Sequence, residues 1–276
     1  MFVSRAVSRV VFRGVLRIVS RAGFRPGFGA IYRATCQLAP LDFLFPPRCL
    51  LCDSVHDLLP GVPFCEPCSG DLLHNMSACC LCAAPLEQVS PAQVSPAQAD
   101  EVCAQCLGKA PAYDYIWSPF VYAQPLEWMI LQLKFSARLS FVPLLSGLMA
   151  QQLPMGHYEL SLPQAIIPMP LHPRRLKQRG FNQSLELVRP LAKLLGLPVD
   201  TSSCSRVRDT EHQTGKTARQ RRVNIKGAFS FENKRNYQHV VIFDDVVTTG
   251  SSVSELSRVL KRAGVRRVDV WCLARA

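Results

Sequence analysis

The hydrophobic pattern of the C-terminal half predicts strands that alternate with helices. Short apolar runs that are rich in β-branched residues predict strands at 165–168, 239–243 and 267–273. Apolar side chains at three- and four-residue spacing, with a starting proline or a closing glycine, predict helices at 125–133, 181–195 and 251–263. Such alternation is typical of an α/β fold in which helices flank a parallel sheet.

The N-terminal segment is basic and has no clean helical periodicity. Residues 1–35 carry seven Arg and no acidic residue, and the apolar runs between the Arg residues are short. A transmembrane helix needs roughly 20 apolar residues and a signal peptide a stretch of about 7–15, so neither is predicted here. We expect residues 1–35 to form a disordered basic extension of a cytoplasmic chain. The alternative is a basic arm that contacts a membrane surface or nucleic acid.

Composition and charge narrow the classes of ligand. The chain has 276 residues, of which 48% are hydrophobic and 19% charged. This composition excludes a wholly disordered chain, a collagen-like repeat and a polytopic membrane protein. The formal net charge is +12, and outside the N-terminal segment the surplus lies in residues 156–276, which hold 21 basic and ten acidic residues. This balance suits an anionic ligand, nucleic acid or an anionic membrane.

Eight of the twelve cysteines form four Cys-x-x-Cys pairs. The pairs are Cys49/Cys52, Cys65/Cys68, Cys79/Cys82 and Cys103/Cys106. Two such pairs supply the four thiolates of a structural zinc site, so we expect two Zn²⁺ ions. Sequential grouping of the pairs is the simplest arrangement, but spacing alone leaves a cross-braced grouping open. Redox or disulfide chemistry is the alternative to zinc.

The four remaining cysteines and a short duplicated segment have no assigned place in these pairs. Cys80 lies next to Cys79 and would compete with it for the metal. The lone residues Cys36, Cys204 and Cys272 are expected to be small buried hydrophobes. A five-residue duplication at 88–97, rich in Pro, Ser and Gln, predicts a loop insertion.

The segment 240–252, VVIFDDVVTTGSS, carries the most specific functional pattern. A buried strand runs into Asp244 and Asp245; two adjacent carboxylates are unfavourable in a core but suit the ligand crevice at the carboxyl end of a parallel strand. The next residues form a glycine-containing turn that opens a helix, whose free N–H groups and positive dipole end favour a phosphate. The alternatives are a plain strand-to-helix turn and, for Ser252 and Glu255, a capping box.

This segment resembles the phosphoribosyl pyrophosphate (PRPP) signature of type I phosphoribosyltransferases. Three further stretches are similar to elements of the competence protein F (ComF)/GntX family: LQLKF at 131–135, a Pro-rich loop with RGFNQ at 167–184, and an Arg/Thr/Gln-rich hood at 206–229. The Cys pairs resemble the N-terminal double zinc ribbon of that family. The resemblance begins at about residue 45 and implies a double zinc ribbon at 45–110 and a phosphoribosyltransferase-like domain at 112–276.

The resemblance also implies roles for particular residues. PRPP would bind with Mg²⁺ along the signature, at Asp244, Asp245, Val246, Val247, Thr248, Thr249, Gly250, Ser251 and Ser252. The expected catalytic residues are Asp244, Asp245 and Arg179. Cations near the leaving pyrophosphate and in the hood would be Arg174, Arg175, Arg208, Lys216 and Arg219.

Two functions follow from the resemblance. The first is transfer of phosphoribose from PRPP to a nitrogen acceptor with release of pyrophosphate, in a protein associated with natural competence and DNA uptake. The second is a non-enzymatic, PRPP-responsive protein that binds single-stranded DNA or docks competence and DNA-uptake proteins through its zinc ribbons. An intact pair of aspartates favours retained PRPP binding in either case.

Overall fold

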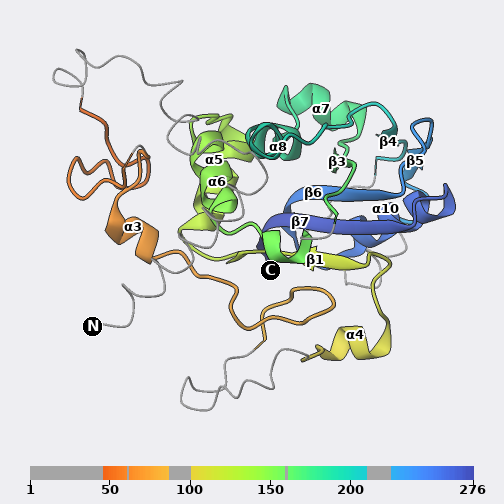
Figure 1. Cartoon of the computed structure of the whole chain (residues 1–276). Helices are drawn as coiled ribbons and strands as arrows, with labels where there is room; N and C mark the ends of the chain where they lie inside the picture. The colour runs from red at the N-terminus through yellow and green to blue at the C-terminus, as the bar shows by residue number, and fades with distance from the viewer. Residues whose placement is uncertain (1–45, 61, 87–100, 159–160, 210–224) are drawn as a thin grey trace.

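The structure is a computed structural model that describes residues 46–60, 62–86, 101–158, 161–209 and 225–276 (Figure 1). The expected N-terminal extension, the duplication at 88–97, Cys36 and the hood residues Lys216 and Arg219 lie outside the described residues. Among the helices that are described, none combines the length and the apolar character needed to cross a membrane.

Parallel strands form the centre of the fold, which confirms the predicted α/β class. The sheet has the order β1–β7–β6–β3, β2 also pairs with β7, and each of these pairings is parallel. Its strands are β1 (Tyr115–Trp117), β2 (Phe120–Val121), β3 (Ala165–Pro168), β6 (His239–Val247) and β7 (Arg267–Arg275). The long strands β6 and β7 lie side by side at the centre (Figure 1), so the carboxyl ends of the strands meet at one edge.

Helices cover both faces of the sheet. One face carries α5 (Leu126–Ser136), α6 (Phe141–Ala150) and α8 (Gln183–Leu195), and the other carries α10 (Ser251–Arg262). In β6, Val241 and Phe243 join the core of α5, α6 and α8, whereas Val240 and Ile242 join the core of α10. Because side chains alternate along a strand and both faces are covered, the run at 239–243 is apolar throughout.

Several boundaries differ from the prediction. Both long strands continue past the end of their apolar runs, to Val247 and Arg275, because their backbone pairing continues. Helix α8 begins later than predicted, since the Asn182 side chain accepts hydrogen bonds from the N–H groups of Ser184 and Leu185 and caps the helix. The pattern does not predict β1, β2 or α6. It also does not predict the short elements α3 (Glu66–Gly70), α4 (Ala104–Gly108), η3 (Met155–Tyr158), α7 (Pro173–Arg179), β4 (Cys204–Arg206) and β5 (Phe229–Phe231).

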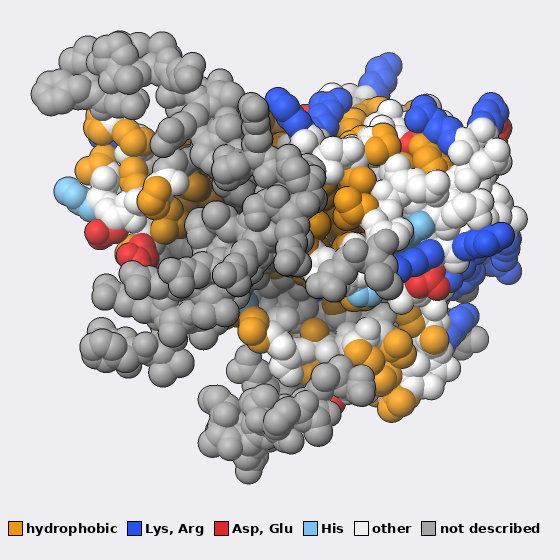
Figure 2. Space-filling view, in the orientation of Figure 1, with side chains coloured by type: hydrophobic (Ala, Val, Ile, Leu, Met, Phe, Trp, Pro, Cys, Tyr) orange, Lys and Arg blue, Asp and Glu red, His pale blue; other side chains and the backbone are white. Residues whose placement is uncertain are grey.

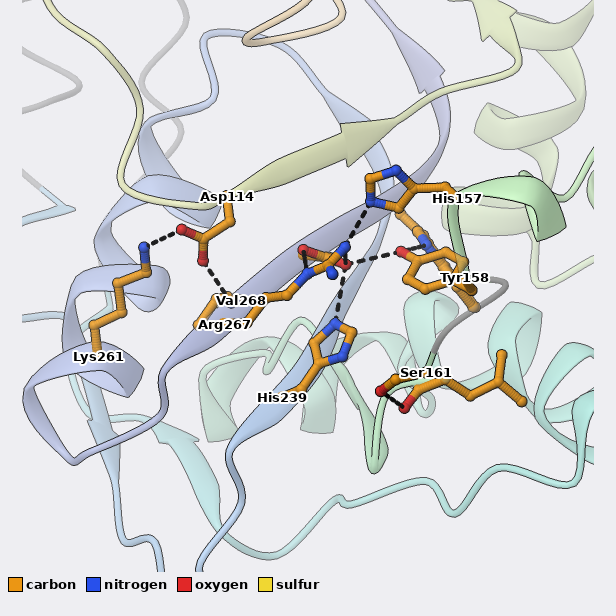
Figure 3. A network of polar contacts seen from close by, with 11 residues as sticks. Asp114, His157, Tyr158, Ser161, His239, Lys261, Arg267 and Val268 are labelled. Carbon is orange, nitrogen blue, oxygen red and sulfur yellow. Dashed lines mark hydrogen bonds and ion pairs between the residues drawn. The ribbon is translucent and has the colours of Figure 1, made fainter.

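A buried polar network fixes the amino-terminal half of the sheet (Figure 3). The Asp269 carboxylate is fully buried and accepts hydrogen bonds from Tyr158, His239 and Arg267 at 3.0–3.1 Å. Burial would raise the pKa of Asp269, but the hydrogen bonds from His239 and Arg267 lower it below its ordinary value. The Trp271 indole N–H in turn donates to the Tyr158 hydroxyl. This network is fully partnered and lies away from the carboxyl ends of the strands, so it serves the fold.

The two Cys-rich segments that resemble zinc ribbons, residues 49–72 and 79–106, pack differently. Phe64 and Leu72, from the first segment, are buried in the same core as α5, α6 and α8. The second segment contributes Ala83 to the core of α10 and also forms a small cluster from Cys79, Cys82 and Cys106. The first segment therefore shares the main core, whereas the second has little apolar area of its own and would gain stability from a metal bound by its cysteines.

On the face seen in Figure 2, the basic side chains gather on one part of the surface. Figure 2 shows Lys and Arg side chains along the top and the right of the face in view, over α7 and the C-terminal elements. Hydrophobic side chains are frequent at the left, where α3 and the first zinc-ribbon segment lie.

Candidate functional site

The eight paired cysteines form two groups of four. The groups are Cys49, Cys52, Cys65 and Cys68, and Cys79, Cys82, Cys103 and Cys106, with the sulfur atoms of each group within 4.8 Å of one another. The grouping is therefore sequential. The Sγ–Sγ distance is 3.6 Å for Cys52 and Cys65 and 3.7 Å for Cys82 and Cys103. Zn–S bonds of about 2.3 Å give roughly this separation in a tetrahedron, so both groups fit structural zinc.

Local hydrogen bonds lower the pKa of one thiol in each group, whereas burial raises the pKa of Cys68 and Cys106. Burial would raise the pKa of Cys49, but backbone N–H groups of Leu51, Cys52 and Cys65 lower it to about 6. The same balance lowers the pKa of Cys79 to about 7. Cys80 is exposed and outside the group, so Cys79 is the ligand of the adjacent pair.

The lone cysteines Cys204 and Cys272 are buried, as predicted. Each lies at a position of a strand whose side chain faces the core of α10.

Asp244 and Asp245 lie near the carboxyl end of β6, beside α5 and α8. Asp244 Oδ1 accepts hydrogen bonds from Ser184 Oγ at 3.1 Å and from the Asp245 N–H at 3.0 Å. Asp245 is 3% exposed, and its Oδ2 lies 2.5 Å from Lys134 Nζ. Gln183 Nε2 donates to Asp245 Oδ1 at 3.4 Å. The two helices on this face therefore supply the partners that hold the acidic pair.

Lys134 makes the two carboxyl groups unequal. Burial raises the pKa of Asp244, and the neighbouring carboxylate of Asp245 raises it further, to about 8. Burial acts in the same direction on Asp245, but the Lys134 ammonium outweighs it and holds the pKa of Asp245 below its ordinary value. The pair thus presents one firmly ionised carboxylate next to one that is readily protonated.

The turn after β6 presents backbone donors. Gly250 caps α10 with φ +70°, a conformation that L side chains rarely adopt. Thr249 Oγ1 and Ser251 Oγ lie 2.9 Å apart, and the Ser251 N–H points to Thr249 Oγ1 at 3.4 Å. The N–H of Ser252 has no acceptor among the described residues. Free donors at the start of a twelve-residue helix suit an anion.

The capping box at the start of α10 is not formed. Gly250 occupies the cap position without a side-chain hydrogen bond. Glu255 Oε1 instead accepts from the Gly227 N–H at 3.0 Å, and its Oε2 pairs with Arg258 at 2.5 Å. The hydroxyls of the turn are therefore not engaged by Glu255.

A buried arginine ties this turn to the second zinc ribbon. Arg275 is 3% exposed, and its Nε donates to the Cys82 carbonyl at 2.9 Å. Its Nη1 donates to the carbonyls of Val247, at 2.9 Å, and of Thr248. Gln105 Nε2, from α4, donates to the Thr249 carbonyl at 3.5 Å. The metal-binding segment thus holds the backbone of the turn in place.

Arg179, at the end of α7, is connected to the acidic pair through one residue. Its Nη1 donates to Gln183 Oε1 at 2.5 Å, and Gln183 reaches Asp245. The guanidinium also lies 5.7 Å from the centroid of the Phe135 ring, whose side chain is 75% exposed. Arg179 is thus at the rim of the site and faces the acidic pair without contacting it.

The other expected cations that the structure describes, Arg174, Arg175 and Arg208, contact groups outside the acidic pair. Arg174 and Arg175, at the start of α7, approach Asp209 at 3.7 and 3.6 Å. Arg208 Nη1 donates to the Lys226 carbonyl at 2.8 Å. The structure therefore brings together the acidic pair, the turn and Arg179, and gathers the two α7 arginines around a different carboxylate.

The sequence analysis did not identify several residues that contact the acidic pair or the turn after β6. Lys134, Gln183 and Ser184 all lie inside the stretches LQLKF and RGFNQS, so a signal was present. A lysine among apolar residues of a predicted helix is expected to seek a carboxylate. Arg275 lies beyond the predicted end of its strand, and no sequence pattern connects it to Cys82.

Comparisons with known proteins place these features in a family. A family model described as a double zinc ribbon domain matches residues 40–107. The "DNA utilization protein YhgH" of Salmonella typhimurium is 38% identical over 213 residues, which are 76% of this chain and 89% of that protein. The protein of the same name from Escherichia coli K12 is 41% identical over 175 residues, 63% of this chain and 77% of its own length.

A relative from Haemophilus influenzae carries the name "Competence protein F". It is 37% identical over 179 residues, which are 63% of this chain and 78% of that protein. The two Cys groups lie in the segment that the double zinc ribbon model matches, and the relatives named above align with most of the chain. The chain therefore belongs to the family of DNA utilization proteins that includes competence protein F.

Proposed function

We propose that the chain binds PRPP at the carboxyl end of β6 and transfers its phosphoribosyl group to a nitrogen nucleophile. The observation that carries the proposal is the position of Asp244 and Asp245, near the end of β6 and two residues before a turn with a free backbone donor. In the proposal the turn from Thr248 to Ser252 holds the 5′-phosphate, and the aspartates accept hydrogen bonds from the ribose hydroxyls.

The donor set at the acidic pair fits Mg²⁺, which prefers carboxylate and phosphate oxygens. Asp244 Oδ1 accepts two hydrogen bonds, whereas its Oδ2 accepts none from the described residues. Asp245 is held by Lys134 and Gln183, so Asp244 is the carboxylate that would hold the ion. When bound, Mg²⁺ would neutralise charge on the pyrophosphate as it leaves.

The proposed reaction is a displacement at ribose C1. The nitrogen lone pair forms a bond to C1, the C1–O bond to pyrophosphate breaks with its electron pair on the leaving oxygen, and the nitrogen releases one proton. Arg179 reaches the acidic pair through Gln183 and would stabilise the leaving group. The further cations proposed to close on the pyrophosphate are Arg174, Arg175, Arg208, Lys216 and Arg219.

Two relatives are named for DNA utilization and for competence, so we assign the proposed reaction to that process. We place it in the cytoplasm, where thiols stay reduced and remain available as zinc ligands.

A turnover assay tests the proposal. Pyrophosphate release from PRPP and Mg²⁺ is measured with the zinc-loaded protein, with ammonia or a series of nucleobases as acceptors. Asp244→Asn is expected to reduce release at least about a hundredfold, because a charge-stabilising group at the reaction centre is lost. Glu232→Gln removes an exposed surface carboxylate and is the matched control. Release that is unaffected by Asp244→Asn would overturn the assignment.

A second candidate function is PRPP-responsive binding of single-stranded DNA without turnover, with the zinc ribbons docking partner proteins. One observation favours it: the exposed ring of Phe135 lies beside the Arg179 guanidinium. Exposed aromatic rings next to cations stack on bases in sequence-tolerant single-strand sites.

Anisotropy of a labelled oligothymidylate, measured over a salt series with and without PRPP, tests the second function. Phe135→Ala is expected to weaken binding by about 1–3 kcal/mol, and Leu107→Ala is the control because Leu107 is equally exposed. Salt-dependent, PRPP-sensitive binding without pyrophosphate release supports this function. Binding that does not change in Phe135→Ala contradicts it.

A further inference from the structure

Arg275 is a buried cation that contacts one of the two groups of paired cysteines. It is 3% exposed and forms no ion pair with a carboxylate among the described residues. Its Nη2 lies 3.9 Å from Cys82 Sγ, and its Nε donates to the Cys82 carbonyl at 2.9 Å. Cys82 belongs to the second Cys group, which is Cys79, Cys82, Cys103 and Cys106. Four thiolates around one Zn²⁺ carry a net negative charge, so the loaded group would supply the counter-charge that a buried guanidinium needs.

The same guanidinium orients the peptide groups at the end of β6. Its Nη1 donates to the carbonyls of Val247, at 2.9 Å, and of Thr248. Gln105 Nε2, also from the second Cys-rich segment, donates to the Thr249 carbonyl at 3.5 Å. Because a peptide group is planar, a held carbonyl also fixes the direction of the N–H of the next residue. These contacts therefore set the directions of the N–H groups of Thr248, Thr249 and Gly250.

These three N–H groups are available to a ligand, since none of them donates to a described residue. Donors that are oriented before binding lose less freedom on binding, so a turn that is held in place binds an anion more tightly. The first group, Cys49, Cys52, Cys65 and Cys68, makes no hydrogen bond with this turn in the described part of the chain, and it packs on the core of α5, α6 and α8. The link to the turn is therefore specific to the second Cys group.

We propose that Arg275 is a positioning residue that couples the metal occupancy of the second Cys group to the order of the turn, and through the turn to the affinity for PRPP. The second part rests on the proposed function, which takes PRPP to be the ligand. Without a metal, the small apolar cluster of the second segment would no longer fix the Cys82 carbonyl and sulfur, and Arg275 would lose its support. Coupling between two sites is reciprocal, so bound PRPP is expected to raise the metal affinity of this group by the same factor.

The ¹⁵N relaxation of the Thr249 and Gly250 amides tests the coupling on the full chain without a ligand. In the zinc-loaded wild type we expect order parameters of about 0.85, and in Cys103→Ser values below about 0.6. Cys52→Ser removes one ligand from the first Cys group instead and is the matched control, with values like those of the wild type. A mobile turn in the zinc-loaded wild type, no change in Cys103→Ser, or equal loss of order in both variants would overturn the proposal.

A charge-preserving variant tests the role of Arg275 itself. Arg275→Lys keeps the buried positive charge but lacks the planar fork that reaches Cys82 and two carbonyls of the turn. It is expected to lower the same order parameters and to raise the PRPP dissociation constant at least about tenfold. Arg267→Lys changes an arginine at the other end of β7, where it contacts Asp269, and is expected to change the dissociation constant less than about twofold. Equal effects of the two substitutions would contradict a specific role for Arg275.

A metal signal separates positioning from a merely structural role. Loading with ¹¹³Cd²⁺ gives each Cys group its own resonance, and that of the second group is identified by its change in Cys103→Ser. We expect PRPP to shift this resonance and not that of the first group, and to lose this effect in Arg275→Lys. A shift that persists in Arg275→Lys would overturn the role of Arg275. If the turn depends on the metal but the wild type does not bind PRPP, the proposed function fails while the coupling of the turn to the second Cys group stands.

Discussion

Replacement of Lys134 by methionine tests how the acidic pair is held. The Nζ of Lys134 lies 2.5 Å from Asp245 Oδ2, and the two side chains are 19% and 4% exposed. Methionine keeps most of the side-chain volume in α5 but leaves a buried carboxylate next to Asp244. Removal of one partner from a buried ion pair destabilises a protein by about 3–5 kcal/mol, so we expect a loss of this size in the free energy of unfolding at pH 7.

A double-mutant cycle shows whether the loss comes from the orphaned charge. Asp245→Asn removes the charge, so Lys134→Met/Asp245→Asn is expected to be at least about 2 kcal/mol more stable than the sum of the single effects. The assay is urea unfolding of the zinc-loaded protein, followed by tryptophan fluorescence. A loss below about 1 kcal/mol, or additive effects, would refute the reasoning.

Three further predictions concern the same elements. The pKa of Asp244 is raised to about 8, so the folded state binds the proton more tightly; stability is expected to fall as pH rises from about 4 to 8, and Asp244→Asn to flatten that slope in urea unfolding. Phe64→Ala is expected to lose about 3–5 kcal/mol, because Phe64 is fully buried in the main core; a loss confined to zinc affinity, with unchanged unfolding of the sheet, would contradict it. Gly250→Ala is expected to cost about 1–2 kcal/mol in thermal unfolding, because φ is +70° and not because of crowding. Gly70→Ala is its control and should be neutral, since nothing lies within 4 Å of that position.

The sequence predicts those parts of the fold that local pattern controls. The run at 239–243 is apolar because both faces of β6 are covered, and the helix after Gly250 has one apolar stripe because only one of its faces meets the sheet. The two Cys groups are equally local, since a two-residue spacer sets each pair. The choice between sequential and cross-braced grouping needed the structure, because it depends on how distant turns meet.

The sequence could not predict contacts between segments that lie far apart along the chain. Lys134 and Asp245 are separated by more than a hundred residues, and only the packing of α5 on the sheet joins them. Arg275 reaches Cys82 because β7 ends next to the second ribbon, which no periodicity encodes. The same holds for Arg174 and Arg175: their charge is visible in the sequence, but their approach to Asp209 is a product of the fold.

The central claim is that the carboxyl end of β6 binds PRPP. Its most direct test is calorimetric titration of PRPP with Mg²⁺ into the zinc-loaded protein, beside Asp244→Asn/Asp245→Asn. The account predicts saturable binding by the wild type and no measurable binding by the variant, with both proteins folded by circular dichroism. No binding by the wild type, or equal binding by both proteins, would contradict it.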